Sequence, residues 1–503
     1  MLKNVAEWLD KTASELPDKT AFSDGDRSLT FAQLRAESRA CAAKLAGHGL
    51  FKAPVVIAMD REPHIISAFM GAAYSGNFYV PIDIEMPAAR IKKIIEKLRP
   101  SAYIASPEYM DLLYDAGADK SMVIPFSEAA AAPPDDRLLA DAAAKQIDTD
   151  LLYILFTSGS TGEPKGVCIS HRNVIDYTNI LKSTFNLDGG AVFGQTIPFT
   201  CDGSVLYIYQ TLQNGCTDYL IPKVCFSFPV KMIDFLNKHK INTIYWVPTS
   251  YAIIAKSGIL DVRTPDYLCR IWFVGEVMPN SVLNIWRKAL PDAQYINFFG
   301  PTEITDTFVY YTADREFDDG APLPIGKPYE NVGVLILDEQ NRLCPPGETG
   351  ELCVRASKIS AGYYNDPERT AGVFVQNPLN TAYREIIYRT GDLGYVNERG
   401  EIMFAGRKDS QIKHYGYRIE LGEIETAANI IGGIGMCACV YDDIDKRIAL
   451  FYTGDADEVY IREKLKLNLQ QHMMPAVIKK LDMLPQHING KIDRISLKNS
   501  LRG

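Results

Sequence analysis

The first 150 residues alternate amphipathic segments with short apolar runs. In HIISAFMGAAYSG and AARIKKIIEKL the apolar positions recur at helical spacing, whereas APVVIAM and YVPID are short runs with β-forming residues. Strands that alternate with helices predict parallel βαβ units. This half of the chain is therefore expected to form a mostly parallel sheet with helices packed on it.

The same alternation resumes over residues 190–320. The apolar runs INTIYWVPTS, LCRIWFVGEV and AQYINFFGPTE each end in polar or glycine-rich residues. Functional groups of an open α/β sheet collect at the carboxyl ends of its strands. We therefore expect Thr249, Gly275, Glu276 and the GPTE segment to lie near a functional site.

Three other segments complete the predicted organisation. Residues 127–145 are rich in Ala, Pro and Asp and are interpreted as a surface connection, while residues 330–405 have the turn-rich pattern of a β-rich subdomain. The last 95 or so residues have a compact βα pattern. We predict an α/β protein: a large N-terminal domain (1–408) of doubly wound α/β subdomains plus a β-rich subdomain, and a small α+β C-terminal domain (409–503).

Composition narrows the class of protein. The chain has 503 residues, more than one core usually accommodates, and 47% hydrophobic with 23% charged residues excludes a disordered or collagen-like chain. Its net charge of −9, without long runs of like charge, argues against nucleic-acid or anionic-membrane binding. No apolar run approaches the roughly 20 residues of a membrane span, and the N-terminus lacks a signal-peptide pattern.

The ten cysteines indicate that the protein works in a reducing compartment. They are scattered through apolar contexts, and the one close pair, Cys437 and Cys439, lies in a strand-like run. Because no spacing resembles a metal-ligand set, buried reduced thiols are expected. We predict a cytoplasmic protein.

Residues 151–167, LLYILFTSGSTGEPKGV, are the segment best suited to bind a phosphate. Glycines let backbone N–H groups approach an anion, and hydroxyls and a lysine add donors. The candidate residues are Thr157, Ser158, Gly159, Ser160, Thr161, Gly162 and Lys165. Pro164 and Gly166 flank the lysine, which excludes a Walker P-loop, so no phosphate-cradling helix is expected after the loop. A plain flexible turn remains the alternative for such a composition.

Further motifs follow in a fixed order along the chain. They are LTFAQL (29–34), YVPIDIEMPAARI (79–91), NFFGPTE (297–303), YRTGD (388–392), GRKDSQIKHYGYRIELGEIE (406–425) and NGKIDR (489–494). With the 157–166 loop, they resemble the core motifs of the adenylate-forming superfamily. The resemblance covers nearly the whole chain and is greatest to amino-acid adenylation domains of non-ribosomal peptide synthetases and to D-alanine:D-alanyl carrier protein ligases.

The resemblance implies an enzyme that joins a carboxylate to the α-phosphate of ATP with the help of Mg²⁺. Charge then accumulates on phosphoryl oxygens, so catalysis is mostly positioning and electrostatic stabilisation. It implies that Glu303 is the metal ligand, beside a catalytic Thr302. Nucleotide contacts implied beyond the phosphate loop are Gly275, Glu276, Asn297, Phe298, Phe299, Gly300, Asp392 and Arg407. Phe299 stands where the family usually has Tyr, and it keeps a stacking face for adenine.

The resemblance also assigns the catalytic cation and a hinge. Lys491, within NGKIDR, is expected to bridge the substrate carboxylate and the α-phosphate. Rotation about Asp409 is expected to withdraw that lysine and to bring the surface around Lys413, Gly416 and Tyr417 to the site for thioester formation. A turn or helix cap is the alternative role for Asp409.

One segment bears on the substrate. In PFTCDGSVLYIY (198–209), Asp202 stands where amino-acid-activating members hold the α-ammonium, and Cys201 replaces the usual aromatic residue. A helix N-cap with Ser204 is the alternative role of Asp202. The substrate pocket implied by motif position comprises Asp202, Gly203, Leu206, Thr249, Trp272, Val274, Phe298, Asp306 and Thr307. Asp306 favours a small polar or basic side chain, because a buried carboxylate needs a partner.

The expected acceptor is the phosphopantetheine arm of a separate acyl or peptidyl carrier protein, since the chain contains no carrier motif of its own. The expected function is therefore amino-acid adenylation followed by thioester formation. Four alternatives stay open: a D-alanine:D-alanyl carrier protein ligase, an acyl- or aryl-CoA ligase, a nucleotide-binding protein without catalysis, and an excised piece of a larger synthetase.

Overall fold

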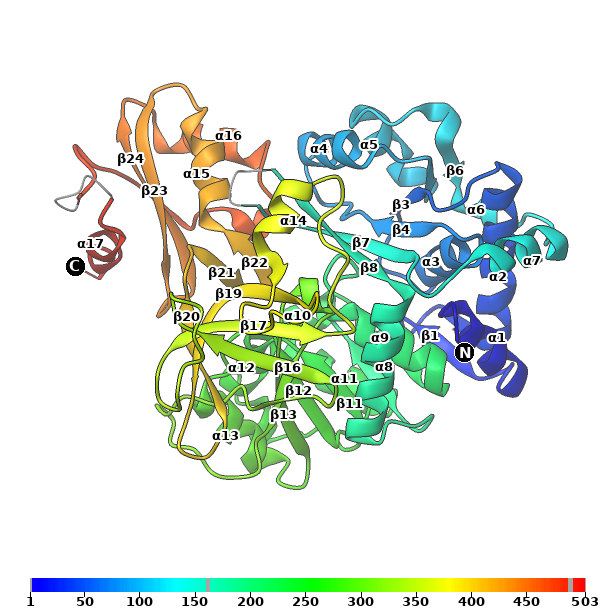
Figure 1. The fold of residues 1–503 in the computed structure, drawn as a ribbon, viewed down its shortest axis with the longest axis horizontal. Helices are drawn as coiled ribbons and strands as arrows, with labels where there is room; N and C mark the ends of the chain where they lie inside the picture. Colours follow the sequence, from blue (N-terminus) through cyan, green and yellow to red (C-terminus); the bar gives the residue numbers. More distant parts are fainter. Residues whose placement is uncertain (1, 160–162, 487–491, 503) are drawn as a thin grey trace.

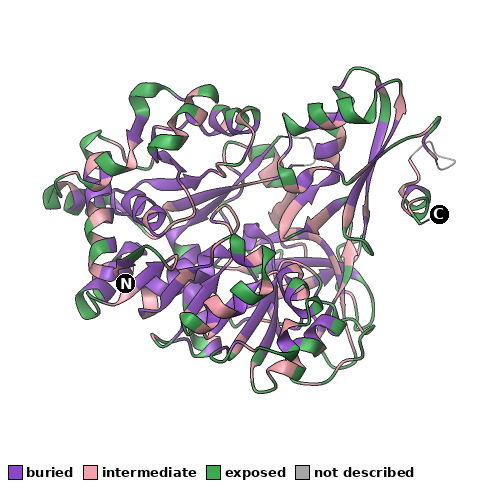
Figure 2. Cartoon of the chain, turned by 180° about the vertical axis from the view of Figure 1, so that it is seen from behind, coloured by how far each residue is buried: buried purple, intermediate pink, exposed green. Residues whose placement is uncertain are grey.

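The computed structural model describes residues 2–159, 163–486 and 492–502. Figure 1 shows three adjoining sheet-containing regions, with the C-terminal helices and strands standing at one side of the molecule. Seen from behind, the strands are largely buried and the outer helices expose one face (Figure 2). The predicted layered α/β architecture is therefore what the chain adopts.

Two large sheets form the N-terminal part of the chain. In spatial order, the first contains β6 (Val123–Pro125), β5 (Ala102–Ala105), β3 (Pro54–Ala58), β4 (Phe78–Pro81), β7 (Leu151–Thr157) and β8 (Lys165–Ser170). The second contains β15 (Lys327–Pro328), β14 (Val309–Thr312), β13 (Gln294–Phe299), β12 (Arg270–Val274), β11 (Thr243–Trp246), β9 (Val192–Gln195), β10 (Thr217–Leu220), β1 (Thr20–Ser23) and β2 (Ser28–Thr30). Both sheets are parallel in their centres and antiparallel at edges, as in β7–β8 and β13–β14.

Helices pack on these sheets through apolar stripes. In α4 the buried Ile91, Ile94, Ile95 and Leu98 follow helical spacing and pack in one cluster with β3 and β5. The helices of this part are α1 (Ala6–Glu15), α2 (Phe31–Gly47), α3 (His64–Tyr74), α4 (Ala88–Leu98), α5 (Met110–Asp115), α6 (Phe126–Ala130), α7 (Asp136–Lys145), α8 (His171–Phe185), α9 (Ser204–Asn214), α10 (Val224–Ser227), α11 (Pro229–Lys238), α12 (Pro248–Lys256) and α13 (Asn280–Ala289).

The remaining chain forms three smaller sheets. The first contains β16 (Val332–Leu337), β17 (Gly350–Ala356), β19 (Ile386–Val396), β18 (Phe374–Gln376) and β20 (Ile402–Arg407), with α14 (Pro367–Val373) before β18. The others are the hairpin β21 (Gln411–His414)–β22 (Tyr417–Glu420) and the sheet β23 (Ile434–Asp442)–β24 (Arg447–Gly454)–β25 (Val477–Lys480). The last helices are α15 (Leu421–Asn429), α16 (Glu458–Lys466) and α17 (Arg494–Asn499).

Two apolar clusters of the C-terminal region contain no residue that precedes Ile412. The region therefore has a core of its own, and it meets the rest of the chain through polar side chains described below. Among the described residues, no helix is long and apolar enough to cross a membrane.

Residues 127–145, expected as a surface connection, are mostly exposed and contain most of α6 and all of α7. Their many alanines favour helix, and Asp135 caps α7 by accepting from the N–H groups of Arg137 and Leu138. The spacing of apolar residues over 459–473 predicts one helix, but α16 ends at Lys466. All ten cysteines are free, as predicted.

Candidate active site

A cavity of about 340 Å³ lies where the strands of the second sheet end. Residues that follow β9, β11, β12 and β13 line one side, including Asp202, Thr249, Gly275 and Thr302. The site therefore forms at the carboxyl ends of parallel strands, where it was predicted. The other side is lined by Asp392, Arg407, Gln411, Lys413, Tyr415, Gly416, Tyr417 and Arg418.

The hairpin β21–β22 closes this cavity. The N–H of Gly416 donates to Oε1 of Glu276 over 3.2 Å, and Nζ of Lys413 lies 3.4 Å from the carbonyl oxygen of Gly300 and 5.1 Å from the centre of the Phe299 ring. The expected surface around Lys413, Gly416 and Tyr417 thus faces the site in this arrangement. Lys413 thus lies over one face of the Phe299 ring, the ring assigned to adenine.

Among the described phosphate-loop candidates, Thr157 ends β7, Ser158 and Gly159 follow it, and Lys165 begins β8. The loop leads into a strand rather than a helix, as its departure from the Walker pattern predicted. Gly159 is required there, because a Cβ atom would lie 2.2 Å from the backbone oxygen of Glu163. Ser158 donates its hydroxyl to the carbonyl oxygen of Arg418 over 2.6 Å. Ser160, Thr161 and Gly162 lie outside the described residues.

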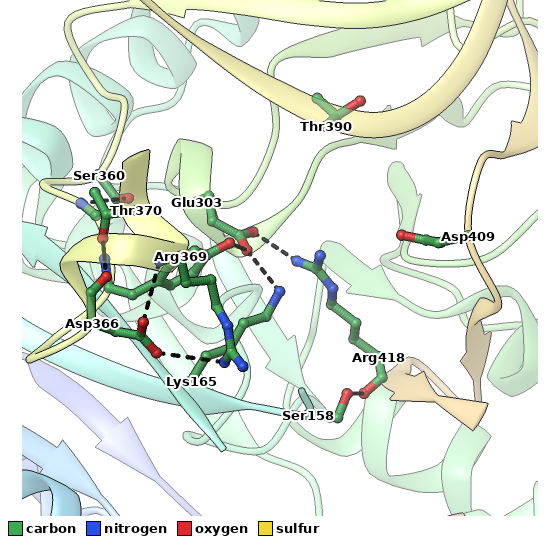
Figure 3. A network of polar contacts seen from close by, with 12 residues as sticks. Ser158, Lys165, Glu303, Ser360, Asp366, Arg369, Thr370, Thr390, Asp409 and Arg418 are labelled. Carbon is green, nitrogen blue, oxygen red and sulfur yellow. Dashed lines mark hydrogen bonds and ion pairs between the residues drawn. The ribbon is translucent and has the colours of Figure 1, made fainter. Parts of the chain in front are cut away.

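Lys165 and Arg418 both point toward the carboxylate of Glu303 (Figure 3). Its Oε1 accepts the Tyr363 hydroxyl at 2.7 Å and lies 3.3 Å from Nζ of Lys165, and its Oε2 accepts from Nη1 of Arg418 at 2.7 Å. Burial acts to raise the pKa of Glu303, but the charges of Arg418 and Lys165 and the Tyr363 hydrogen bond outweigh it and lower the pKa. Glu303 is therefore held as a buried anion.

Burial, together with the charge of Arg418, lowers the pKa of Lys165 to about 8, although Glu303 opposes this shift. Its side chain is 8% exposed and faces Glu303. Thr157 precedes Ser158, and its buried hydroxyl has no hydrogen-bond partner in the described part of the chain. A lysine, a free hydroxyl and an arginine beside one cavity suit an anionic ligand.

Asp392 and Arg407 form the opposite wall. Arg407 donates to Asp392 over 2.5 Å from Nη1, and its Nε lies 2.7 Å from Oδ1 of Asp409. Burial raises the pKa of Asp392, while Arg407 acts in the opposite direction. Asp409 also accepts the N–H of Gln411, so the turn role considered for it is present alongside the ion pair.

Asp202 lies just before the N-terminus of α9 and lines the cavity. Its Oδ1 accepts the N–H of Gly203, and the N-cap position of α9 is Gly203, without a side-chain cap. The alternative role of Asp202 as an N-cap is therefore wrong. Burial raises the pKa of Asp202, and the Thr302 hydroxyl and the charge of Lys413 partly offset that rise.

Asp306 also lines the cavity, but protein groups already satisfy it. Tyr177 and Tyr245 both donate their hydroxyls to its carboxylate, the latter at 2.8 and 3.0 Å. Burial and the charge of Asp202 raise the pKa of Asp306 to about 7. The expectation that this carboxylate needs a substrate group as its partner is therefore wrong, because two tyrosines supply that partner.

The other predicted pocket residues divide into two groups. Gly203, Thr249 and Val274 line the cavity. Trp272 and Phe298 are buried in an aromatic cluster with Phe185, and they are not among the cavity-lining residues. Leu206, Asn297 and Thr307 are buried too; Asn297 donates to the carbonyl oxygen of Pro324 and Thr307 is hydrogen-bonded to Tyr329.

Lys491 lies outside the described residues. The segment after it is described: Arg494 pairs with Glu425 at 2.6 Å, and Leu497 packs against β23 and β24. Figure 1 shows α17 at the outer side of β23 and β24, away from β21 and β22.

Sequence reasoning missed Arg418 and the pair formed by Arg90 and Glu423. Arg418 stands in the quoted GYRIE stretch but received no role, and Arg90 and Glu423 form a buried ion pair between α4 and α15. The sequence around Arg418 or Arg90 does not indicate the carboxylate that each arginine pairs with, because Glu303 and Glu423 are far away in the chain.

Comparison with known proteins identifies the family of this chain. A family model described as "AMP-binding enzyme" matches residues 9–364. The chain belongs to the AMP-binding enzyme family. The resemblance inferred from the motifs is thereby confirmed.

Named relatives of this AMP-binding enzyme differ in length. It is 31% identical to "Delta-poly-L-ornithine synthetase" of Acinetobacter baumannii over 98% of its own length, but it spans only 36% of that relative. It is 30% identical to "D-alanine--D-alanyl carrier protein ligase" of Bacillus mycoides, with 98% of both chains covered. The Vibrio cholerae adenylation domain AlmE, solved with glycyl-adenosine-5'-phosphate, has a TM-score of 0.85 at 21% identity over 100% of this chain and 98% of AlmE, which establishes the fold.

Proposed function

We propose that this protein activates an amino acid as an aminoacyl-AMP and then transfers it to the phosphopantetheine thiol of a separate carrier protein. The observation that carries the proposal is a single cavity lined by Asp202 and also by Asp392 and Arg407. A buried carboxylate suits an ammonium group, and the Asp392 carboxylate suits the ribose hydroxyls of a nucleotide. The cavity thus has places for both substrates of an adenylation reaction.

The proposed reaction has two steps. In the first, a carboxylate oxygen of the amino acid attacks the α-phosphorus of ATP, the bond to the β-phosphate breaks, and pyrophosphate leaves. In the second, the carrier thiol loses its proton to solvent, its sulfur attacks the acyl carbon, and AMP leaves. Lys165 and Arg418 are proposed to interact with phosphate oxygens, which is supported by their buried positive charges beside Glu303.

Mg²⁺ fits Glu303 only in part. No set of three His, Cys, Asp or Glu side chains among the described residues could hold a metal, but magnesium is often held by one carboxylate together with substrate phosphates. Glu303 is such a single ionised carboxylate. The ion would neutralise phosphate charge. It would bind Oε2 of Glu303 only after Arg418, which now donates a hydrogen bond to that atom, had moved away.

Two orientations of the C-terminal domain are part of the proposal. Its separate core supports a boundary between residues 408 and 409, with Asp409 as the hinge. In the orientation described, β21–β22 covers the cavity, which suits thioester formation. The other orientation is proposed to bring Lys491 to the substrate carboxylate and the α-phosphate.

The substrate is proposed to be an amino acid with a small or basic side chain, on the strength of the relatives rather than of Asp306. The names of the relatives above refer to L-ornithine, D-alanine and a glycyl adenylate, which supports amino acids as the class. The ten free thiols suit a reducing compartment and support action in the cytoplasm.

Amino-acid-dependent pyrophosphate release with ATP and Mg²⁺ tests the proposal. The panel contains the proteinogenic L-amino acids, common D-isomers, ornithine, and several aryl and fatty acids. A response to one or two amino acids is expected. A response only to acids without an amine would reject the role of Asp202 and indicate an acyl-CoA ligase, and no response at all would reject adenylation.

A further inference from the structure

Glu276 joins the wall of the cavity to the tip of the β21–β22 hairpin. Its Oε2 accepts two hydrogen bonds from Thr249, one from the backbone N–H at 3.1 Å and one from the hydroxyl at 2.5 Å. Its Oε1 accepts the N–H of Gly416 at 3.2 Å. One carboxylate therefore holds two segments that belong to different parts of the chain.

The contact around this carboxylate has little freedom to adjust. Gly416 has a φ of +80°, and a Cβ atom at this position would lie 2.5 Å from Cγ1 of Val247. Val247, Thr249 and Gly416 all line the cavity. A displacement of the wall at Val247 or Thr249 must therefore move the hairpin tip or break its contact, since packed interfaces resist gradual deformation.

Both oxygens of Glu276 are used by protein groups in this arrangement. The sequence placed Glu276 beside adenine, yet its carboxylate faces the pocket wall and the hairpin instead. The carboxylate accepts backbone N–H groups from both segments, and its short bond, at 2.5 Å, comes from the Thr249 hydroxyl. Its position suits the transmission of a shift from one segment to the other.

We propose that Glu276 is a positioning residue that couples the wall of the amino-acid pocket to the docking of the hairpin tip. The amino acid bound beside Thr249 then influences thiol transfer as well as adenylation, because the hairpin must be docked for transfer. The predicted effect on thiol transfer rests on the proposed function. The coupling between the pocket wall and the hairpin tip does not.

The first test needs no substrate. Hydrogen exchange of the full chain is followed in peptides that contain Gly416, for the unmodified protein, for Thr249→Val, Glu276→Ala and Glu276→Gln, and for Thr249→Val combined with each Glu276 variant. Thr249→Val removes the hydroxyl donor on the pocket side, and it is expected to speed exchange at Gly416 by about 3-fold or more. Glu339→Ala, at an exposed glutamate in the turn after β16, is the matched control.

The decisive result is non-additivity. If Glu276 carries the coupling, Thr249→Val has no further effect at Gly416 once Glu276 is Ala, and Glu276→Gln, which keeps one acceptor oxygen, gives an intermediate rate. Effects of the two substitutions that simply multiply would overturn the proposal. If Glu276→Ala does not fold, the same comparison is made with Glu276→Gln.

The second test separates the two half-reactions. Glu276→Ala is expected to slow single-turnover transfer from preformed adenylate by about 10-fold, with a smaller change in the kcat of adenylation. Equal slowing of both half-reactions would overturn the coupling role. If the unmodified protein activates no amino acid, the proposed function has failed, and the exchange experiment still decides whether Glu276 couples the two segments.

Discussion

Arg418 donates from Nη1 to Oε2 of Glu303 over 2.7 Å, and this bond joins the hairpin to the loop that follows β13. Glu303 is fully buried, and its other oxygen faces Tyr363 and Lys165. Glu303 is thus paired with one cation from β8, Lys165, and one from the hairpin, Arg418. If Glu303 holds the proposed metal through Oε2, metal binding and hairpin docking compete for that oxygen atom.

Arg418→Gln tests whether this ion pair docks the hairpin. Removing one partner of a buried pair is expected to lower the free energy of unfolding by about 3 kcal/mol, because Glu303 keeps only Lys165 as a charged partner. Residues near 405–425 should become more sensitive to proteolysis, and transfer should slow more than adenylation. Urea denaturation, limited proteolysis and single-turnover rates measure these effects. Arg399→Gln, at an exposed arginine, is the control, and unchanged proteolysis would contradict the docking role.

A second buried pair has the opposite polarity, with Arg90 on the large domain and Glu423 on α15. Their side chains are 7% and 3% exposed. Arg90→Glu or Glu423→Arg alone places like charges together and should destabilise the protein by about 3–5 kcal/mol. The double reversal should recover at least about 2 kcal/mol of that loss. Denaturation of all four proteins measures the coupling, and a double variant as unstable as the sum of the singles would show that the pair does not act as a unit.

Asp202→Asn tests the proposed ammonium anchor. The substitution removes the charge but keeps the size, so the KM of the amino acid should rise by about 10- to 100-fold while the KM of ATP changes little. Pyrophosphate exchange at varied substrate concentrations gives both constants. An unchanged KM for the amino acid would show that Asp202 does not bind the ammonium.

Much of the fold was predictable because it depends on local periodicity. Segments such as α4 and β7 can be recognised from the spacing of their buried apolar residues. The carboxyl ends of β9, β11, β12 and β13 lie at one edge of the sheet, so Thr249, Gly275 and Glu276 were expected near one site without any knowledge of their contacts. Asp202 was assigned through the family resemblance.

The contacts that satisfy the site were not predictable in the same way. Asp306 is satisfied by Tyr177 from α8 and Tyr245 from β11, and the pairing of three remote elements leaves no pattern in the sequence. The Arg418–Glu303 pair depends on how the C-terminal domain is oriented, which no local periodicity encodes. Sequence reasoning therefore found candidate residues but not their partners.

Lys491→Ala tests the proposed catalytic cation, which lies outside the described residues. Loss of a charge that bridges two anionic groups should reduce adenylation by about 100-fold or more, while transfer from supplied adenylate is retained. Pyrophosphate release and transfer from chemically prepared adenylate are measured on the same preparation. Equal loss in both assays would count against alternation of the domain.

Asp306→Asn tests the electrostatic state of the pocket floor. Burial and the charge of Asp202 raise the folded pKa of Asp306 to about 7 from an ordinary value of 3.8. The folded state therefore binds the proton more tightly than the unfolded chain, and stability from this group is full below pH 3.8 and is lost as the pH rises toward 7. Asn cannot titrate, yet its amide oxygen still accepts from Tyr177 or Tyr245. Lys358, whose pKa burial lowers to about 7, stays charged below that pH.

The stability of the unmodified protein relative to Asp306→Asn should therefore fall between pH 4 and about 6.5, by at most roughly 4 kcal/mol. Denaturant unfolding of both proteins across this range measures the difference. A difference that stays constant with pH would mean that Asp306 keeps an ordinary pKa and is ionised throughout. Its two tyrosine hydroxyls would then offset the cost of burying the charge, and a basic substrate would gain from an anion already present at neutral pH.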